Sequence, residues 1–181
     1  MTTATSSLPA TTVPAALRRL YFVRFGFALV WAVLLLLSAG KLGPLSVALL
    51  IVYPLFDVAA AVVDLRSSRT PALIANIVIS GLATVGLVVA TTSGIPAVLR
   101  VWGAWAIVAG IVQLVVAVRR RALGGQWPMI LSGGISVLAG TSFALSASAA
   151  DPSLTSLGGY ALLGGVFFLV SAIRLRASVR S

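Results

Sequence analysis

The most constraining feature of the sequence is a long apolar run, Val101–Val118, that contains no charged residue. About 20 helical residues, at ~1.5 Å of rise per residue, cross the ~30 Å hydrocarbon core of a bilayer, so this run predicts a transmembrane helix. Three arginines, Arg119–Arg121, end the run, and a glycine pair and Trp127 lead into a second apolar run. Arginines between two apolar runs are typical of a cytoplasmic turn, so the stretch predicts a helical hairpin in a membrane.

The composition excludes most classes of soluble protein. Of the 181 residues, 60% are hydrophobic and only 9% are charged, whereas soluble proteins have roughly 25% charged residues. The net charge is +10, but the basic residues lie at the ends of apolar runs, which predicts contact with lipid headgroups and no nucleic-acid partner. The chain has no cysteine, no histidine and three acidic residues. We therefore predict no metal, no cofactor, no catalytic residue and no enzymatic activity.

The apolar runs together predict an all-α membrane protein with six transmembrane helices. Their expected bounds are about 20–38, 45–63, 72–90, 97–118, 127–146 and 154–173. Residues 1–17 are mostly Thr, Ser, Pro and Ala without an apolar period, which predicts a disordered cytoplasmic tail. Residues 18–176 then form a single transmembrane domain, and residues 177–181 form a second cytoplasmic tail.

The basic residues predict the orientation of the helices. All of them except Lys41 and Arg100 fall on one side of the predicted topology. The positive-inside rule assigns that side to the cytoplasm, so both termini of this multi-pass protein are expected there. Twelve arginines against one lysine suggest a bacterial source. The predicted cytoplasmic basic anchors are Arg66, Arg69, Arg119, Arg120, Arg121, Arg174 and Arg176.

An internal repeat divides the chain into three predicted hairpins, at 18–66, 71–121 and 126–176. When the even-numbered spans are aligned on the arginines that end them, small residues recur at the same three offsets in the fourth and sixth spans. Small residues at such spacings share one helix face and let two backbones approach closely in a membrane. The predicted helix-packing seams are Gly103, Ala106 and Gly110, and Gly158, Ala161 and Gly165.

The segment Trp102–Gly140, which contains GIVQLVVAVRRRALGGQWPMILSGGISVLAG, resembles the HdeD-type acid-resistance membrane proteins. The likeness consists of glycines, the arginine-rich turn and the tryptophan after it, and it covers the second and third hairpins better than the first. The resemblance implies a six-span inner-membrane protein built from a short repeat, linked to acid or envelope stress. It implies no catalytic motif and no established molecular activity.

The first hairpin carries a carboxylate where the other two have a seam glycine. Asp57 lies nine residues before Arg66, which is about 13 Å along a helix and close to the bilayer midplane. An ionised aspartate there costs at least ~2.5–3.5 kcal/mol, so it is expected to pair, to be protonated or to face a polar interior. Arg24, inside the cytoplasmic end of the first span, is one candidate partner. The candidate intramembrane polar site is Asp57, Arg24, Tyr53, Asn76 and Gln113.

Three interpretations of Asp57 stay open: a buried pair with Arg24 that fixes packing, a proton or solute site, and a contact to another subunit. The first functional hypothesis is a non-enzymatic membrane protein that acts in acid or envelope stress, as a scaffold or accessory subunit. The alternative is a small proton-coupled transporter or channel, which predicts a polar cavity that reaches Asp57. A lipid-modifying enzyme is the third and least supported. Expected partners are the bilayer, anionic lipids, and a second copy or another subunit of a membrane complex.

Aromatic residues near the predicted interfaces are expected to anchor the helices at the headgroup level. These are Tyr21, Trp102, Trp105, Trp127 and Tyr160. Trp31 lies in mid-span and is expected to pack against neighbouring helices. Arg100 is expected to extend its side chain to the headgroups on the outer side.

Overall fold

The computed structural model describes residues 12–66, 69–119, 121–123 and 127–177. Within this part of the chain there are six long helices, one 3-10 turn and no strand. Each long helix contains a stretch long and apolar enough to cross a membrane, which confirms the six predicted spans as helices. The elements are α1 (Thr12–Ser38), α2 (Pro44–Leu65), α3 (Pro71–Ala90), α4 (Ile95–Arg119), η1 (Arg121–Leu123), α5 (Trp127–Ser146) and α6 (Thr155–Ala177).

The tail prediction was wrong at its inner end, because α1 begins at Thr12 and residues 12–17 are helical. Pro14 lies in the first turn of this helix, where the missing N–H of proline has no helical partner to lose. The rest of that tail, residues 1–11, lies outside the described residues. So do Arg120 and the end of the second tail, residues 178–181.

Prolines and one glycine set the boundaries of the inner helices. Pro44 and Pro71 are the first residues of α2 and α3, where the fixed φ of proline suits the first helical turn. Thr70 caps α3, because its hydroxyl accepts a hydrogen bond from the Leu73 amide at 3.4 Å. Gly94, between α3 and α4, has φ of +96°, a conformation that favours glycine.

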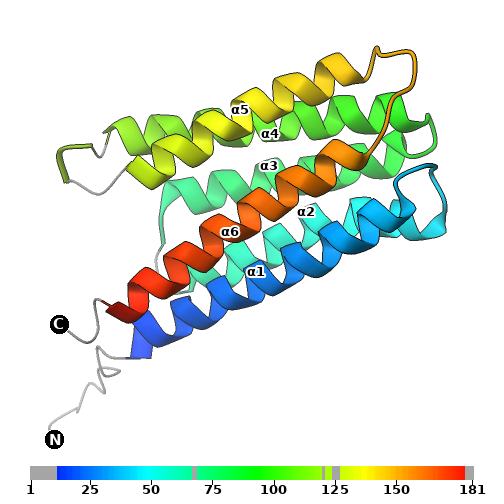
Figure 1. Cartoon of the computed structure of the whole chain (residues 1–181). Helices are drawn as coiled ribbons and strands as arrows, with labels where there is room; N and C mark the ends of the chain where they lie inside the picture. The colour runs from blue at the N-terminus through cyan, green and yellow to red at the C-terminus, as the bar shows by residue number, and fades with distance from the viewer. Residues whose placement is uncertain (1–11, 67–68, 120, 124–126, 178–181) are drawn as a thin grey trace, which may run out of the picture.

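The six helices form a closed ring in chain order, with α6 returning to pack against α1 (Figure 1). Helices contact only their two neighbours around this ring at the level of the backbone. The three most extensive contacts are α4 with α5, α1 with α6, and α2 with α3. Each predicted hairpin instead pairs helices that pack less extensively, α1 with α2, α3 with α4 and α5 with α6, so the packing does not confirm the three-hairpin repeat.

The two seams account for this pairing. Gly103 and Gly110 of α4 lie against Gly140 and Gly133 of α5, so close that a Cβ on either α4 glycine would stand 2.7 Å from the opposite carbonyl oxygen. Ala106 between them is also buried. Backbones at this distance exclude any side chain larger than hydrogen, and the close approach maximises van der Waals contact between the helices.

The α6 seam packs against α1. A Cβ on Gly158 would lie 2.9 Å from the Leu36 side chain, and one on Gly165 would lie 3.2 Å from the Ala28 methyl group. Ala161 is fully buried in the same interface. Each seam therefore packs its helix against the neighbour from a different predicted hairpin.

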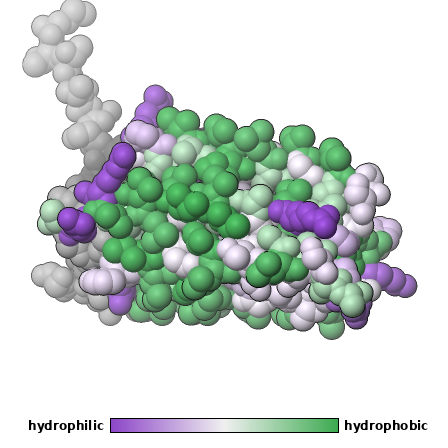
Figure 2. Space-filling view, turned by 90° about the horizontal axis from the view of Figure 1, so that it is seen from above, coloured by the Kyte–Doolittle hydropathy of each residue, from purple (hydrophilic) through white to green (hydrophobic). Residues whose placement is uncertain are grey.

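One end of the bundle carries most of the described basic side chains. α1 begins and α6 ends at this end, together with the α2–α3 and α4–α5 connections (Figure 1). We call it the arginine-rich end, defined by Arg18, Arg19, Arg66, Arg69, Arg119, Arg121 and Arg174. Figure 2 shows a largely hydrophobic flank with hydrophilic residues gathered mostly near the two ends.

The flank exposes large apolar side chains, as a lipid-facing surface requires. Leu37, Leu82 and Leu138 are 80%, 68% and 73% exposed. Apolar surface of this extent is rare on a soluble monomer, whereas a bilayer solvates it without cost. The fold thus defines a multi-pass helical membrane protein.

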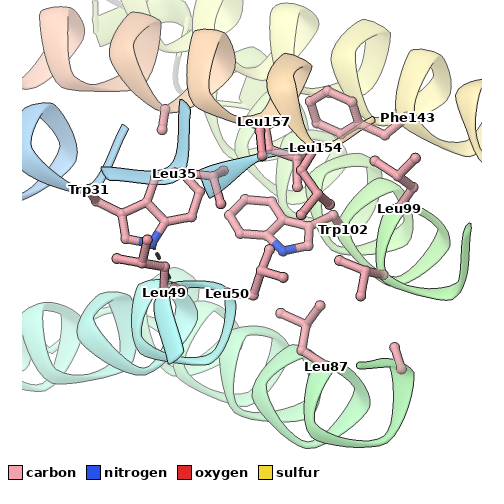
Figure 3. Packing of buried hydrophobic residues seen from close by; sticks show 14 of the residues in the cluster. Trp31, Leu35, Leu49, Leu50, Leu87, Leu99, Trp102, Phe143, Leu154 and Leu157 are labelled. Carbon is pink, nitrogen blue, oxygen red and sulfur yellow. Dashed lines mark hydrogen bonds between the residues drawn. The ribbon is translucent and has the colours of Figure 1, made fainter. Parts of the chain in front are cut away.

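The tightest core lies at the other end of the bundle, which we call the opposite end. Trp31 and Trp102 lie at its centre, with ring centroids 5.6 Å apart, surrounded by leucines from five helices (Figure 3). The Trp31 indole N–H donates to the Leu49 carbonyl at 2.6 Å. The anchor prediction for Trp102 was wrong, because this side chain is fully buried. Because apolar residues cover every side of α4, hydrophobicity alone does not indicate where Trp102 points.

Candidate functional site

Asp57 is the centre of a polar cluster between α1, α2 and α3. Its carboxylate forms an ion pair with Arg24 of α1. Its other oxygen, Oδ2, accepts hydrogen bonds from Asn76 Nδ2 at 2.7 Å and Ser80 Oγ at 2.9 Å, both from α3. We call Arg24, Asp57, Asn76 and Ser80 the Asp57 cluster. Burial of a carboxylate in an apolar bundle is costly unless it is paired and hydrogen-bonded, and this cluster supplies both conditions.

Two further helices contact the cluster. The Trp105 indole N–H of α4 donates to Ser80 Oγ at 3.2 Å. The guanidinium of Arg24 lies over the Phe168 ring of α6, with 4.3 Å between Cζ and the ring centroid, which is a cation–π contact. The cluster therefore joins five of the six helices through side chains.

A cavity of about 560 Å³ adjoins the cluster and draws its lining from all six helices. Its polar lining consists of Tyr21, Arg24, Tyr53, Asp57, Asn76, Gln113, Ser132, Ser136, Tyr160 and Ser171. Its apolar lining includes Trp105, Phe167, Phe168, Pro128 and Met129. Cavities that bind small molecules are of this size and combine apolar walls with a few convergent polar groups.

The cavity occupies the half of the bundle nearer the arginine-rich end. Gln113, Met129 and Ser171 line it within the last turns at that end. Toward the opposite end the lining stops at Tyr53, Trp105 and Tyr160. Beyond these residues the bundle is filled by the core around Trp31 and Trp102 (Figure 3). The cavity thus ends at aromatic packing toward the opposite end.

All five residues of the predicted polar site line this cavity, but they do not all contact Asp57. Arg24 and Asn76 bind its carboxylate directly. Tyr53 packs its ring against Trp31 and Trp102, with centroids 4.5 and 5.4 Å apart. Gln113 lies nearer the arginine-rich end and donates to the Met129 carbonyl at 3.2 Å.

Sequence reasoning missed Ser80, Ser136 and Phe168. Ser80 follows Asn76 by four residues, so both side chains lie on the same face of α3, and that spacing was a usable signal. Phe168 and Ser136 reach the site only because α6 closes the ring against α1 and because α5 packs on α4. No spacing along the chain indicates contacts of that kind.

The anchor prediction also fails for Trp105 and Tyr160, which face the bundle interior. The Tyr160 hydroxyl shares a hydrogen bond of 2.9 Å with Ser136 Oγ, and Trp105 binds the Asp57 cluster. Trp127, by contrast, is 78% exposed at the start of α5. Tyr21 is half-buried against Phe168, with 5.9 Å between the ring centroids.

The cluster and cavity offer hydrogen-bond donors, one neutralised ion pair and aromatic walls. Among the described residues there is no group of three His, Cys, Asp or Glu side chains that is placed to hold a metal ion. The donors, the ion pair and the aromatic walls can bind a ligand reversibly through hydrogen bonds, charge and apolar contact.

The fold and site define a class, a multi-pass helical membrane protein with a polar cavity at one end. The chain matches no protein-family model, no curated protein and no solved structure. The resemblance to HdeD-type proteins therefore stays a prediction.

Proposed function

We propose that this chain is a non-enzymatic inner-membrane protein that carries a small solute or protons through the site at Asp57. The observation that supports this proposal is the polar cavity that reaches the Asp57 cluster. A purely structural ion pair needs no adjoining cavity, whereas a transport site needs access from one side of the membrane at a time.

In this proposal the arginine-rich end lies in the cytoplasm, with both termini. The support is the concentration of basic residues at that end, where all but Lys41 and Arg100 are expected from the sequence. The cavity then opens toward the cytoplasm, and the core around Trp31 and Trp102 closes it on the outer side. The basic anchors at the same end attract anionic lipids.

The Asp57 cluster couples protonation to packing. The most extensive contacts divide the ring into three pairs, α1 with α6, α2 with α3, and α4 with α5. The ion pair between Arg24 and Asp57 connects the first pair to the second. Protonation of Asp57 removes its charge and weakens this connection, which favours movement of one pair against the other.

Several other groups form hydrogen bonds with Asp57 or lie within electrostatic range of it or of Arg24. Asn76 and Ser80 of α3 donate to it. Tyr53 of α2 and Tyr160 of α6 lie within electrostatic range of it, and Asp64 and Tyr21 lie within range of its partner Arg24. Trp105 of α4 and Ser136 of α5 are uncharged. The proposed protonation step therefore depends on Arg24 as the one cation that the structure shows at Asp57.

Proton flux into proteoliposomes tests this function directly. Wild-type protein and Asp57→Asn are compared with a pH-sensitive dye at acidic and neutral pH. We expect flux in the wild type and loss of it in the variant, since asparagine keeps the shape but does not exchange a proton. Flux no greater than that of empty liposomes would contradict the carrier function. Arg100→Gln, at the other end of the bundle, is the control for general damage.

A structural role is the second candidate, and the full pairing of Asp57 favours it. Arg24, Asn76 and Ser80 satisfy the carboxylate without any ligand. In this case the chain acts as a scaffold or accessory subunit in acid or envelope stress, as the HdeD resemblance implies, built on the three-hairpin repeat. Absent flux together with a lower melting temperature of Asp57→Asn would favour this role.

A further inference from the structure

Arg24 has unused hydrogen-bonding capacity in the cavity. A guanidinium carries five N–H donors, and within the described residues only Nη2 of Arg24 has a hydrogen-bond partner, the Asp57 carboxylate. The side chain is only 15% exposed, and it lines the cavity with its flat face over Phe168. A buried guanidinium with free donors is well suited to bind an oxyanion.

Asp57 is not an equivalent site for a cation. A carboxylate offers about four lone-pair positions, and Arg24, Asn76 and Ser80 already donate to three of them. Arg24 thus has more unused hydrogen-bond donors than Asp57 has unused acceptor positions. The ion pair therefore offers the cavity mainly hydrogen-bond donors. The hydroxyls of Tyr53 and Ser132 add further groups that can donate to an anion.

The electrostatic field near the cavity also favours anions over cations. The arginine-rich end bears exposed Arg66, Arg69, Arg119, Arg121 and Arg174. Positive charge at the end of the bundle nearer the cavity raises the local concentration of anions there.

We propose that the cavity binds a small anion that bears a carboxylate or a phosphate, with Arg24 as its anchor and Asp57 as the internal anion that competes with it. This inference deepens the proposed carrier function, because the anion would be the solute carried at that site. Loss of the Asp57 charge then frees Arg24, so protonation and anion binding favour one another. The aromatic walls of Trp105 and Phe167 suit an anion with a flat apolar body.

Benzoate is the probe, because it joins a carboxylate to an aromatic ring small enough for the cavity. Binding of radiolabelled benzoate is measured on purified protein in neutral detergent. We expect Arg24→Gln to weaken binding about tenfold or more, since a charge-assisted hydrogen bond is lost. Asp57→Asn should bind benzoate more tightly than wild type, because the competing charge is gone. Arg100→Gln, an exposed arginine on α4, should leave binding unchanged.

The double variant Arg24→Gln/Asp57→Asn protects the test against misfolding, because it removes both charges and leaves no unpaired ion. We expect it to fold and not to bind benzoate. Equal binding in this variant and in wild type would overturn the proposal. So would an absence of binding in both wild type and Asp57→Asn.

Competition separates the two sources of the anion. Displacement of benzoate by inorganic phosphate supports a soluble anion, and displacement only in nanodiscs with phosphatidylglycerol, compared with phosphatidylcholine, supports a lipid headgroup at the same site. The outcome is independent of the carrier function. Benzoate binding without proton flux would contradict the carrier function and support the anion site. Proton flux without benzoate binding would support the carrier function and contradict the anion site.

Discussion

Each member of the Asp57 cluster has a partner that offsets its burial. Asp57 and Arg24 neutralise one another, and Asn76 and Ser80 use their donors on the same carboxylate. Among buried side-chain polar atoms in the described residues, the Trp102 indole nitrogen has no partner. It lies in the core around Trp31 and Trp102, so this core contains one unsatisfied buried donor.

The coupling within the ion pair can be measured by a double-mutant cycle. Asp57→Leu and Arg24→Leu should each lower the unfolding free energy by about 1–3 kcal/mol, because each leaves a partner unpaired in an apolar bundle. The double variant should lose less than the sum, by about 1 kcal/mol or more. Thermal unfolding in detergent, followed by tryptophan fluorescence, provides the measurement. Strictly additive losses would show that the two side chains do not interact.

At the scale of the elements, small residues decide which helices pair. Glycines on α4 and α5 bring two backbones together, and the α6 seam does the same against α1. The small-residue spacing was visible in the sequence, and the predicted seam residues of α4 and α6 lie in these two contacts. The identity of the partner helix was not visible, because each of these helices is apolar on every face and fits several neighbours equally well.

Adjacent glycines on α5 provide a matched test of the seam. A Cβ on Gly133 would lie 2.9 Å from the Gly110 carbonyl oxygen, whereas one on Gly134 would have no atom within 4 Å. We expect Gly133→Ala to destabilise the protein by about 1–3 kcal/mol through overpacking. Gly134→Ala should be neutral or stabilising by up to about 1 kcal/mol, since alanine favours helix. Melting temperatures of the two variants give the comparison, and equal values would argue against the α4–α5 seam.

The whole molecule is a ring of helices with a polar cavity in one half and an aromatic core in the other. The arrangement depends on α6 closing against α1, which brings Phe168 over Arg24 beside the cavity. In the proposed carrier, this arrangement gives Asp57 access to the arginine-rich end and blocks it from the opposite end. The proposed carrier requires that, in each of its states, the site at Asp57 is accessible from only one side of the membrane.

Cysteine labelling tests both the access and the orientation, because the chain has no native cysteine. Ser132→Cys, in the cavity lining, should react with a membrane-impermeant thiol reagent from the cytoplasmic side only. Ser93→Cys and Ser148→Cys, exposed in the connections at the opposite end, should react from the outside only. Labelling of Ser132→Cys from the outside would contradict the closed core, and a reversed pattern at Ser93 would contradict the proposed orientation.

The sequence by itself determined the helical membrane fold and the need for a partner at Asp57. Length, uninterrupted apolar composition and the positions of arginine and proline are local properties, so they are readable residue by residue. A lone carboxylate in such a run must also be compensated, and Arg24 and Asn76 were among the few candidates available.

Only the tertiary structure decided how the helices are paired and what surrounds that carboxylate. It put Trp102 in the core and Gln113 away from Asp57, and it created the cavity. These outcomes depend on the rotation of each helix about its own axis and on its choice of neighbour. In a chain that is apolar on almost every face, packing among helices sets both, and no local pattern records them.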